Sequence, residues 1–314
     1  MDPTLVYNIQ SGPIWDWRVA VDLFAGGVGV GAFLFAIILA RLGDQRYQRL
    51  AQTAAVIAPF LVMLGLLFLF WKIGNKFNVY QMAINLAPTS LMWWGFLIQS
   101  ALVVLGLVHA WLWLDRASNA TRDALGLLVG LLALLVGIYH GLLLAVLTSH
   151  PLWATGSIVL MAILAFASTG VAGVLLTHLI RTLVTGRGEE EVDLAEYVNG
   201  LRPVRNILGT TLVLMLVNFF LWWVDLSFGS LQSKQALEGA LSAYGPMFMQ
   251  MGIGLGLIVP LILIVWFFGK APIKNPARTL SVIGLASLLV LVGGFVIRYA
   301  VVMGGQVPLP ISTL

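Results

Sequence analysis

The sequence predicts an all-α integral membrane protein with eight transmembrane helices, and three observations carry that prediction. Of the 314 residues, 60% are hydrophobic and only 10% are charged, whereas a soluble domain carries about 25% charged residues. The mean hydropathy is +0.98. The apolar residues also gather into eight uninterrupted runs, each long enough to cross about 30 Å of hydrocarbon. This composition excludes an ordinary soluble enzyme, a disordered chain and a nucleic-acid-binding protein.

The runs follow one another along the whole chain and define the predicted spans. In order, these cover about residues 19–40, 54–71, 91–114, 124–148, 155–180, 207–224, 244–268 and 279–303. Only two charged residues, Asp22 and Arg298, fall inside them, as expected where burying a charge is costly. No connection exceeds about 26 residues, so residues 1–314 form a single polytopic membrane domain that includes the first span.

The positive charges of the connections predict the orientation. Twelve Lys and Arg residues occupy the connections after spans 1, 3, 5 and 7. The other connections carry only Lys72, Lys76 and Lys234, with Arg18 at the membrane edge. Because cytoplasmic loops are rich in Lys and Arg, we expect both termini to lie outside. The two longer outer connections, 72–90 and 225–243, are then the places where an outside partner would dock.

The polar residues inside the spans share one depth. With this orientation they lie within about two turns of the outer face, and they are Asp22, Gln99, Tyr139, His140, Asn218, Gln250 and Arg298. Random polar substitutions would not favour one leaflet, so we interpret the set as a polar cavity or proton relay that opens outward. Interhelical hydrogen bonds are the alternative for any single residue.

Several apparent motifs have simpler explanations. Gly27 and Gly31 form a GxxxG pair in the first span, which predicts close helix packing rather than nucleotide binding. The chain has no cysteine, so it holds no iron–sulfur cluster of its own. Bis-histidine haem needs two histidines at matching depth, and only His109 and His178 could form such a pair. We therefore expect no haem and no metal ligands.

The start of the third span carries the first family resemblance. Thr89 and Ser90 follow Pro88 as a helix start with a hydroxyl cap, and Trp93-Trp94-Gly95 comes next. The free N–H groups of such a helix end also suit an electron-rich oxygen. This stretch resembles the third-span signature of the NrfD/PsrC family, the membrane subunits of polysulfide reductase and its relatives.

Three further stretches follow the family's order and spacing. They are Trp15 and Trp17 before Asp22, Tyr139-His140-Gly141 leading into His150-Pro151-Leu152-Trp153, and Ile297-Arg298-Tyr299 followed by Gly304-Gly305-Gln306. The resemblance implies eight helices in two four-helix bundles and a quinone, menaquinone or ubiquinone, near the outer face. It also implies an iron–sulfur electron-transfer subunit and a molybdenum or tungsten (molybdopterin) catalytic subunit on the outer side, in a prokaryotic inner membrane.

The resemblance also assigns roles to particular residues. The family's quinone pocket uses an asparagine, a histidine and a tyrosine, and these positions correspond here to Val19, Asp22 and Tyr139. Because Val19 cannot hydrogen-bond, Gln99 or His140 would substitute. Asp22 would exchange protons with the outside, and Arg298 would tune Asp22 or complete the relay.

The hydroxyls and indoles at the start of the third span complete the predicted site. Thr89, Ser90 and Trp93 would contact the quinone, and Trp15, Trp17 and Trp93 would line the pocket or face the iron–sulfur partner. An interfacial tryptophan belt is the alternative for these indoles.

The sequence thus predicts the quinone-reactive anchor of a respiratory oxidoreductase complex, without an independent catalytic domain. The alternatives are a secondary transporter or proton-conducting subunit, which broken helices and inverted repeats would favour, and a purely structural anchor.

Overall fold

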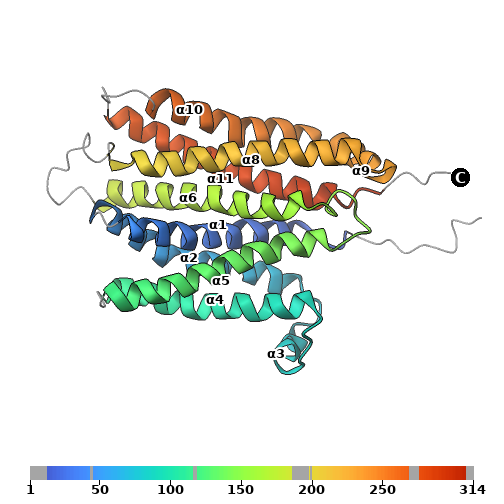
Figure 1. The fold of residues 1–314 in the computed structure, drawn as a ribbon, viewed down its shortest axis with the longest axis horizontal. Coiled ribbons are helices and arrows are strands. Elements are labelled where there is room, and N and C mark those ends of the chain that lie inside the picture. The colour runs from blue at the N-terminus through green and yellow to red at the C-terminus, as the bar shows by residue number, and fades with distance from the viewer. Residues whose placement is uncertain are drawn as a thin grey trace, which may run out of the picture.

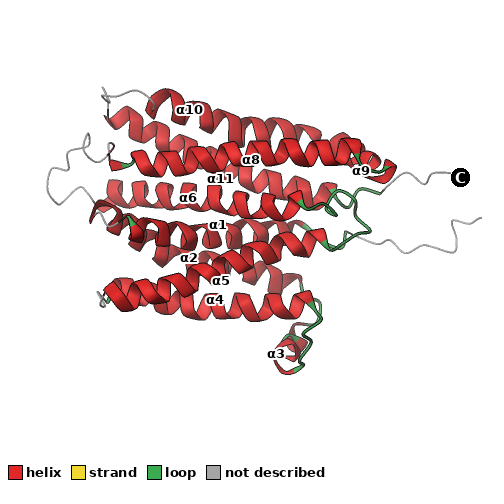
Figure 2. Ribbon diagram, in the orientation of Figure 1, coloured by secondary structure: helices red, strands yellow, loops and turns green. Residues whose placement is uncertain are grey.

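The computed structural model describes residues 13–42, 45–115, 119–185, 198, 200–268 and 276–308. Within these ranges the protein forms helices and turns and contains no strand (Figure 2). Eight of its helices are long and apolar enough to cross a membrane, and they run side by side along the long axis of the molecule (Figure 1). The prediction of an all-α protein with eight spans is therefore confirmed.

The first four spans are α1 (Trp17–Arg41), α2 (Gln45–Lys72), α4 (Leu91–Leu114) and α5 (Asn119–Ala145). A 3₁₀ turn, η2 (Lys76–Asn78), and a single helical turn, α3 (Gln81–Ile84), lie between α2 and α4. The later spans are α6 (Ser157–Thr185), α8 (Arg202–Phe228), the composite α9 (Leu231–Gly245), η3 (Pro246–Ile258) and α10 (Val259–Phe268), and α11 (Pro276–Gly304). Several helices continue beyond the apolar runs, because polar residues at the membrane surface still form backbone hydrogen bonds.

The seventh span differs from its prediction. The connection expected at 225–243 is helical, because α8 continues to Phe228 and α9 begins at Leu231 after a turn at Gly229 and Ser230. Ser230 caps α9 by accepting a hydrogen bond from the backbone N–H of Ser233. The span then passes through the 13-residue π-helix η3, which hydrophobic periodicity does not reveal. The connection predicted at 225–243 is thus only a tight turn between α8 and α9.

α1 and α6 occupy the middle of the molecule (Figure 1) and pack through glycines. Gly31 on α1 and Gly170 on α6 bring their backbones into direct contact, so that a Cβ on either would overlap the other helix. One turn earlier, Gly27 lies against the ring of Phe166. The packing role predicted for Gly27 and Gly31 is confirmed. The division into two four-helix bundles stays a prediction.

A clasp joins the beginning of the first span to the end of the last. Trp15 stacks on Trp153, with ring centroids 5.2 Å apart, and Trp153 donates to the carbonyl of Val301 at 2.8 Å. The side chain of Gln306 accepts from the N–H of Trp15 at 2.9 Å and donates to its carbonyl at 2.7 Å. The start of α1, the α5–α6 connection and the end of α11 therefore share one end of the bundle. That this end faces outside stays a prediction.

Candidate functional site

Several of the predicted polar residues lie together near the clasped end of the bundle. Gln99 on α4 donates to His140 on α5 across 3.3 Å, and the ring of His140 lies 5.4 Å from that of Tyr139. Asp22 comes from α1, which packs against the α5 helix that carries Tyr139 and His140. The structure thus places Asp22, Tyr139, His140 and Gln99 in one row, which we call the polar row.

Asp22 is the buried acid of the polar row. Its side chain is only 4% exposed and lies five residues, or about 7.5 Å, past the start of α1. Oδ1 lies against Gly65 of α2, 2.8 Å from where a Cβ would stand. No described residue donates a hydrogen bond to this carboxyl group. Because buried polar groups normally have partners, Asp22 is a group with an unused bonding capacity.

Tyr139 depends on a glycine of the neighbouring helix for its position. A Cβ on Gly95 of α4 would overlap the phenol ring and its hydroxyl oxygen. Gly95 therefore lets the two helices approach with a tyrosine between them. The hydroxyl accordingly lies against Gly95, which the sequence alone identifies only as part of a motif.

His140 is buried, at 3% exposure, and both of its ring nitrogens have partners. Nδ1 lies 2.8 Å from the carbonyl of Val136, so this nitrogen carries the hydrogen and donates it. Nε2 then accepts from the amide of Gln99. This pairing fits a neutral imidazole and leaves neither nitrogen for a ligand, so His140 acts here by holding Gln99.

The ring of Phe166 contacts both Arg298 on α11 and His140 of the polar row. The Arg298 guanidinium is 5.2 Å from the centre of the Phe166 ring, and His140 meets that ring from 5.5 Å. The guanidinium donates to the carbonyl of Gly294 at 2.8 Å and to Thr169 Oγ1 at 3.0 Å. Among the described residues no ion pair joins Arg298 to Asp22. Direct tuning of Asp22, one of the two roles expected for Arg298, therefore has no contact to support it.

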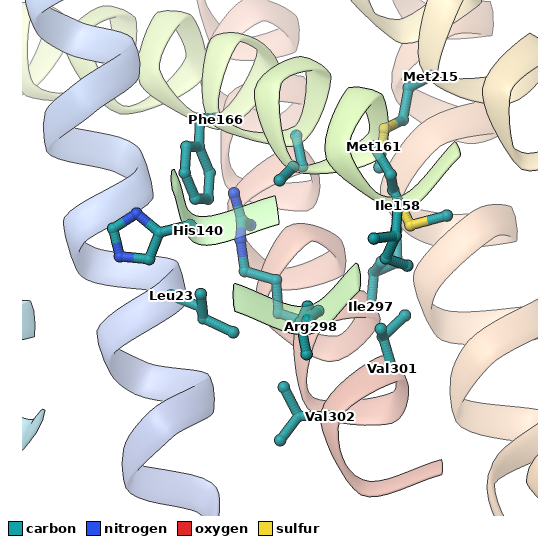
Figure 3. A pocket seen from close by; sticks show the side chains of 13 residues that line it. Leu23, His140, Ile158, Met161, Phe166, Met215, Ile297, Arg298, Val301 and Val302 are labelled. Carbon is teal, nitrogen blue, oxygen red and sulfur yellow. The ribbon is translucent and has the colours of Figure 1, made fainter. Parts of the chain in front are cut away.

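A small cavity of about 40 Å³ adjoins Arg298 and His140. Figure 3 shows the guanidinium below Phe166, with His140 to one side and Ile158 and Met161 to the other. One water molecule occupies about 10–15 Å³ by this measure, so the cavity has room for about three. It is too small for a quinone ring.

The residues at the start of α4 have different positions from those expected. Ser90 is the helix cap, since its hydroxyl accepts from the backbone N–H of Trp93 at 3.4 Å, which confirms the capping interpretation. Thr89 is exposed. Trp93 packs edge-on against Trp94 at 5.0 Å, and its buried indole N–H has no partner among the residues that the structure describes. None of Thr89, Ser90 and Trp93 hydrogen-bonds to the polar row.

The remaining expected residues are also accounted for. Trp15 belongs to the clasp, whereas Trp17 is exposed beside Phe68 and Trp71 of α2. Gln250 is exposed on η3, so its predicted place in an interior cavity is wrong. Asn218 is buried, and its Oδ1 has no partner within the described residues.

The two histidines considered for haem have different partners. Nε2 of His109 accepts from the indole of Trp113 at 3.2 Å, and Nδ1 of His178 lies 3.4 Å from Thr53 Oγ1. The residues described include no group of three or more His, Cys, Asp and Glu side chains that could hold a metal ion.

Three contributors to the site are not predicted by the sequence. Gly65 and Gly95 make room for Asp22 and Tyr139, and Thr169 accepts from Arg298. The polar interruption Ser168-Thr169-Gly170 within an apolar run is the available signal for Thr169. Nothing distinguishes Gly65 or Gly95 from other span glycines until their neighbours are known.

Comparison with known proteins identifies the family of this sequence. A family model described as "Polysulphide reductase, NrfD" matches residues 6–310, nearly the whole length. The protein belongs to the NrfD family. Its relatives include protein NrfD of Escherichia coli strain K12, which is 28% identical over 98% of this chain and 99% of the relative.

Two further relatives of this NrfD-family protein have informative names. The C chain of polysulfide reductase from Wolinella succinogenes is 26% identical, covering 93% of this sequence and 94% of the relative. The NrfD homolog of Haemophilus influenzae is 24% identical over the same shares of each sequence. One relative is thus a named part of a reductase, and this NrfD-family protein is a multi-pass membrane subunit of the same family.

Proposed function

We propose that this protein is the membrane anchor of a respiratory molybdenum- or tungsten-containing iron–sulfur oxidoreductase. It binds a quinone or quinol near the outer face and exchanges electrons with an iron–sulfur partner. The observation that carries the proposal is Asp22, a buried carboxyl group without a donor among the described residues, about 7.5 Å past the start of α1. A quinol hydroxyl is a donor of the kind that Asp22 lacks.

The side chains of the polar row divide the binding of a head group among them. Tyr139 would hold the head group by donating its hydroxyl hydrogen to one oxygen, and Asp22 would accept a hydrogen bond, and on oxidation a proton, from the quinol hydroxyl at the other. His140 positions Gln99 through the 3.3 Å hydrogen bond, so that the amide oxygen of Gln99 can contact the substituents of the quinone ring. When bound, the quinone, menaquinone or ubiquinone, supplies a two-electron, two-proton couple.

The head group reaches the polar row from the side of Asp22 and Tyr139. The Arg298 cavity, at about 40 Å³, cannot take a ring, which supports this direction of approach. Trp93 contributes a further donor where α4 begins, because its buried indole N–H has no partner among the described residues. Arg298 would complete the relay without an ion pair to Asp22.

Electrons leave or arrive through partner subunits. Because the sequence has no cysteine, the protein cannot bind an iron–sulfur cluster through its own thiolates. A partner iron–sulfur subunit, connected to a molybdopterin catalytic subunit, docks at the clasped end, where α3 projects beside α4 (Figure 1). The exposed side chains of Phe77, Ile84 and Leu86 provide apolar contacts there. The complex lies in a prokaryotic inner membrane.

The decisive experiment uses the co-purified complex and the substitution Asp22→Asn. We expect quinol-linked turnover to fall by about two orders of magnitude or more, with unchanged subunit composition and iron content. Asp16→Asn is the matched control, because Asp16 is a carboxylate one and a half turns away that pairs with Arg18 and Lys72 at the surface. Full turnover in Asp22→Asn, or a complex without iron and insensitive to quinone-site inhibitors, would refute the proposal.

A further inference from the structure

Arg298 is a buried cation whose charge no described side chain balances. The residue is 6% exposed, and no carboxylate within the described ranges lies within 4 Å of its guanidinium. Its two hydrogen bonds go to neutral oxygens, the carbonyl of Gly294 and the hydroxyl of Thr169. The Nε–H has no acceptor among the described residues. A buried charge without an opposite charge is strongly unfavourable, so Arg298 needs a partner that carries negative charge.

The cavity next to this guanidinium has the right place and size for that group. It is bounded by Arg298 and His140 on one side and by apolar side chains on the other, among them Met161 and Ile297 (Figure 3). Its volume of about 40 Å³, which is room for about three water molecules, accommodates one monatomic ion. A phosphate ester or a lipid headgroup would not fit.

We propose that this cavity binds one monovalent anion of about the size of chloride. Water alone is the weaker occupant, because it is uncharged and would leave the buried guanidinium without an opposite charge. A halide carries that opposite charge and can accept a hydrogen bond from the Nε–H, which has no partner among the described residues. The rings of Phe24 and Phe166 lie 5.5 and 5.2 Å from the guanidinium.

The site follows from Arg298 and its cavity and does not depend on the proposed quinone reaction. It does bear on the polar row, because Arg298 and His140 both contact Phe166. An anion beside Arg298 cancels the positive field that would otherwise reach His140. With the anion bound, the surroundings of Arg298 and Phe166 thus carry almost no net charge.

The test measures halide binding to the full-length protein in its purified complex. Radiolabelled chloride should bind with one site per protein molecule, and bromide should give an anomalous scattering peak within the cavity of a crystal. At constant ionic strength, replacing gluconate by chloride at about a hundredfold its Kd should raise the Tm by roughly 3–5 °C. Absence of the bound chloride, or an equal Tm in gluconate and chloride, would overturn the proposal.

Three variants separate a specific site from general salt effects. Arg298→Met removes the charge and should abolish the halide response. Ala165→Leu keeps Arg298 but fills the cavity that Ala165 lines, so it should also abolish the response, and it remains decisive if Arg298→Met does not fold. Thr169→Val removes only a neutral partner of Arg298 and should keep the response. A halide response that persists in Ala165→Leu would place the anion elsewhere and refute the site.

Discussion

Replacement of Gly95 by alanine tests whether the position of Tyr139 matters. A Cβ on Gly95 would overlap the phenol ring and its hydroxyl oxygen. Carbon atoms in ordinary contact stand about 3.5–4.0 Å apart, so the ring must move by more than about 1 Å. Overpacking of this kind costs about 1–3 kcal/mol of stability. A misplacement of about 1 Å in a reacting site lowers the rate roughly 100-fold.

The assay is oxidation of a soluble quinol analogue by the intact complex, with turnover expressed per iron to correct for assembly. We expect Gly95→Ala to reduce turnover about 100-fold while the subunits still co-purify. Gly209→Ala is the matched control, because Gly209 is also helical and a Cβ there meets nothing within 4 Å. That variant should keep full turnover. Turnover of Gly95→Ala within about twofold of the unmodified complex would contradict the role assigned to the position of Tyr139.

Three further substitutions test the surroundings of the site. The Arg18 guanidinium lowers the pKa of Asp16 from 3.8 to about 2, so the ionised carboxylate stabilises the folded protein. This contribution to stability is complete above the unfolded pKa and is lost as the pH falls through the folded pKa. Asp16→Asn should therefore lower stability by roughly 1 kcal/mol at pH 7, and a Tm difference that does not shrink between pH 4 and pH 2 contradicts this. Gln306→Leu, which opens the clasp to Trp15, should speed proteolysis before α1, and unchanged cleavage rates would argue against it. Gly170→Ala forces apart two touching backbones and should cost roughly 2–3 kcal/mol in thermal unfolding; an unaltered Tm would exclude the close contact.

Some of the site follows from the sequence itself. A charged residue inside an apolar run is rare because hydrocarbon penalises it, so Asp22 and Arg298 identify themselves without a structure. Their predicted depth, and that of Gln99 and His140, follows from counting residues along spans whose direction is itself predicted from the loop charges. The bond between Gln99 and His140 agrees with this count.

Other relations depend on which helices become neighbours. The sequence allows Arg298 to act on Asp22, but in the folded protein the guanidinium bonds to Gly294 and Thr169 and forms no ion pair with Asp22 among the described residues. Gln250 is at the expected depth but on the exposed face of η3. The depth of a residue follows from its position along the span, which residue counting provides. The direction in which its side chain faces is set by helix rotation and by π-helical turns, which periodicity does not encode.

The sequence by itself determined the class of molecule, the number of spans and the residues whose burial needs an explanation. These depend on the free energy of transferring each side chain into lipid, which is a local property. Only the tertiary structure decided that Gly95 makes room for Tyr139, that Asp22 lacks a donor among the described residues, and that a cavity adjoins Arg298. Such features arise from contacts between residues far apart in the sequence, and close packing fixes them to fractions of an ångström.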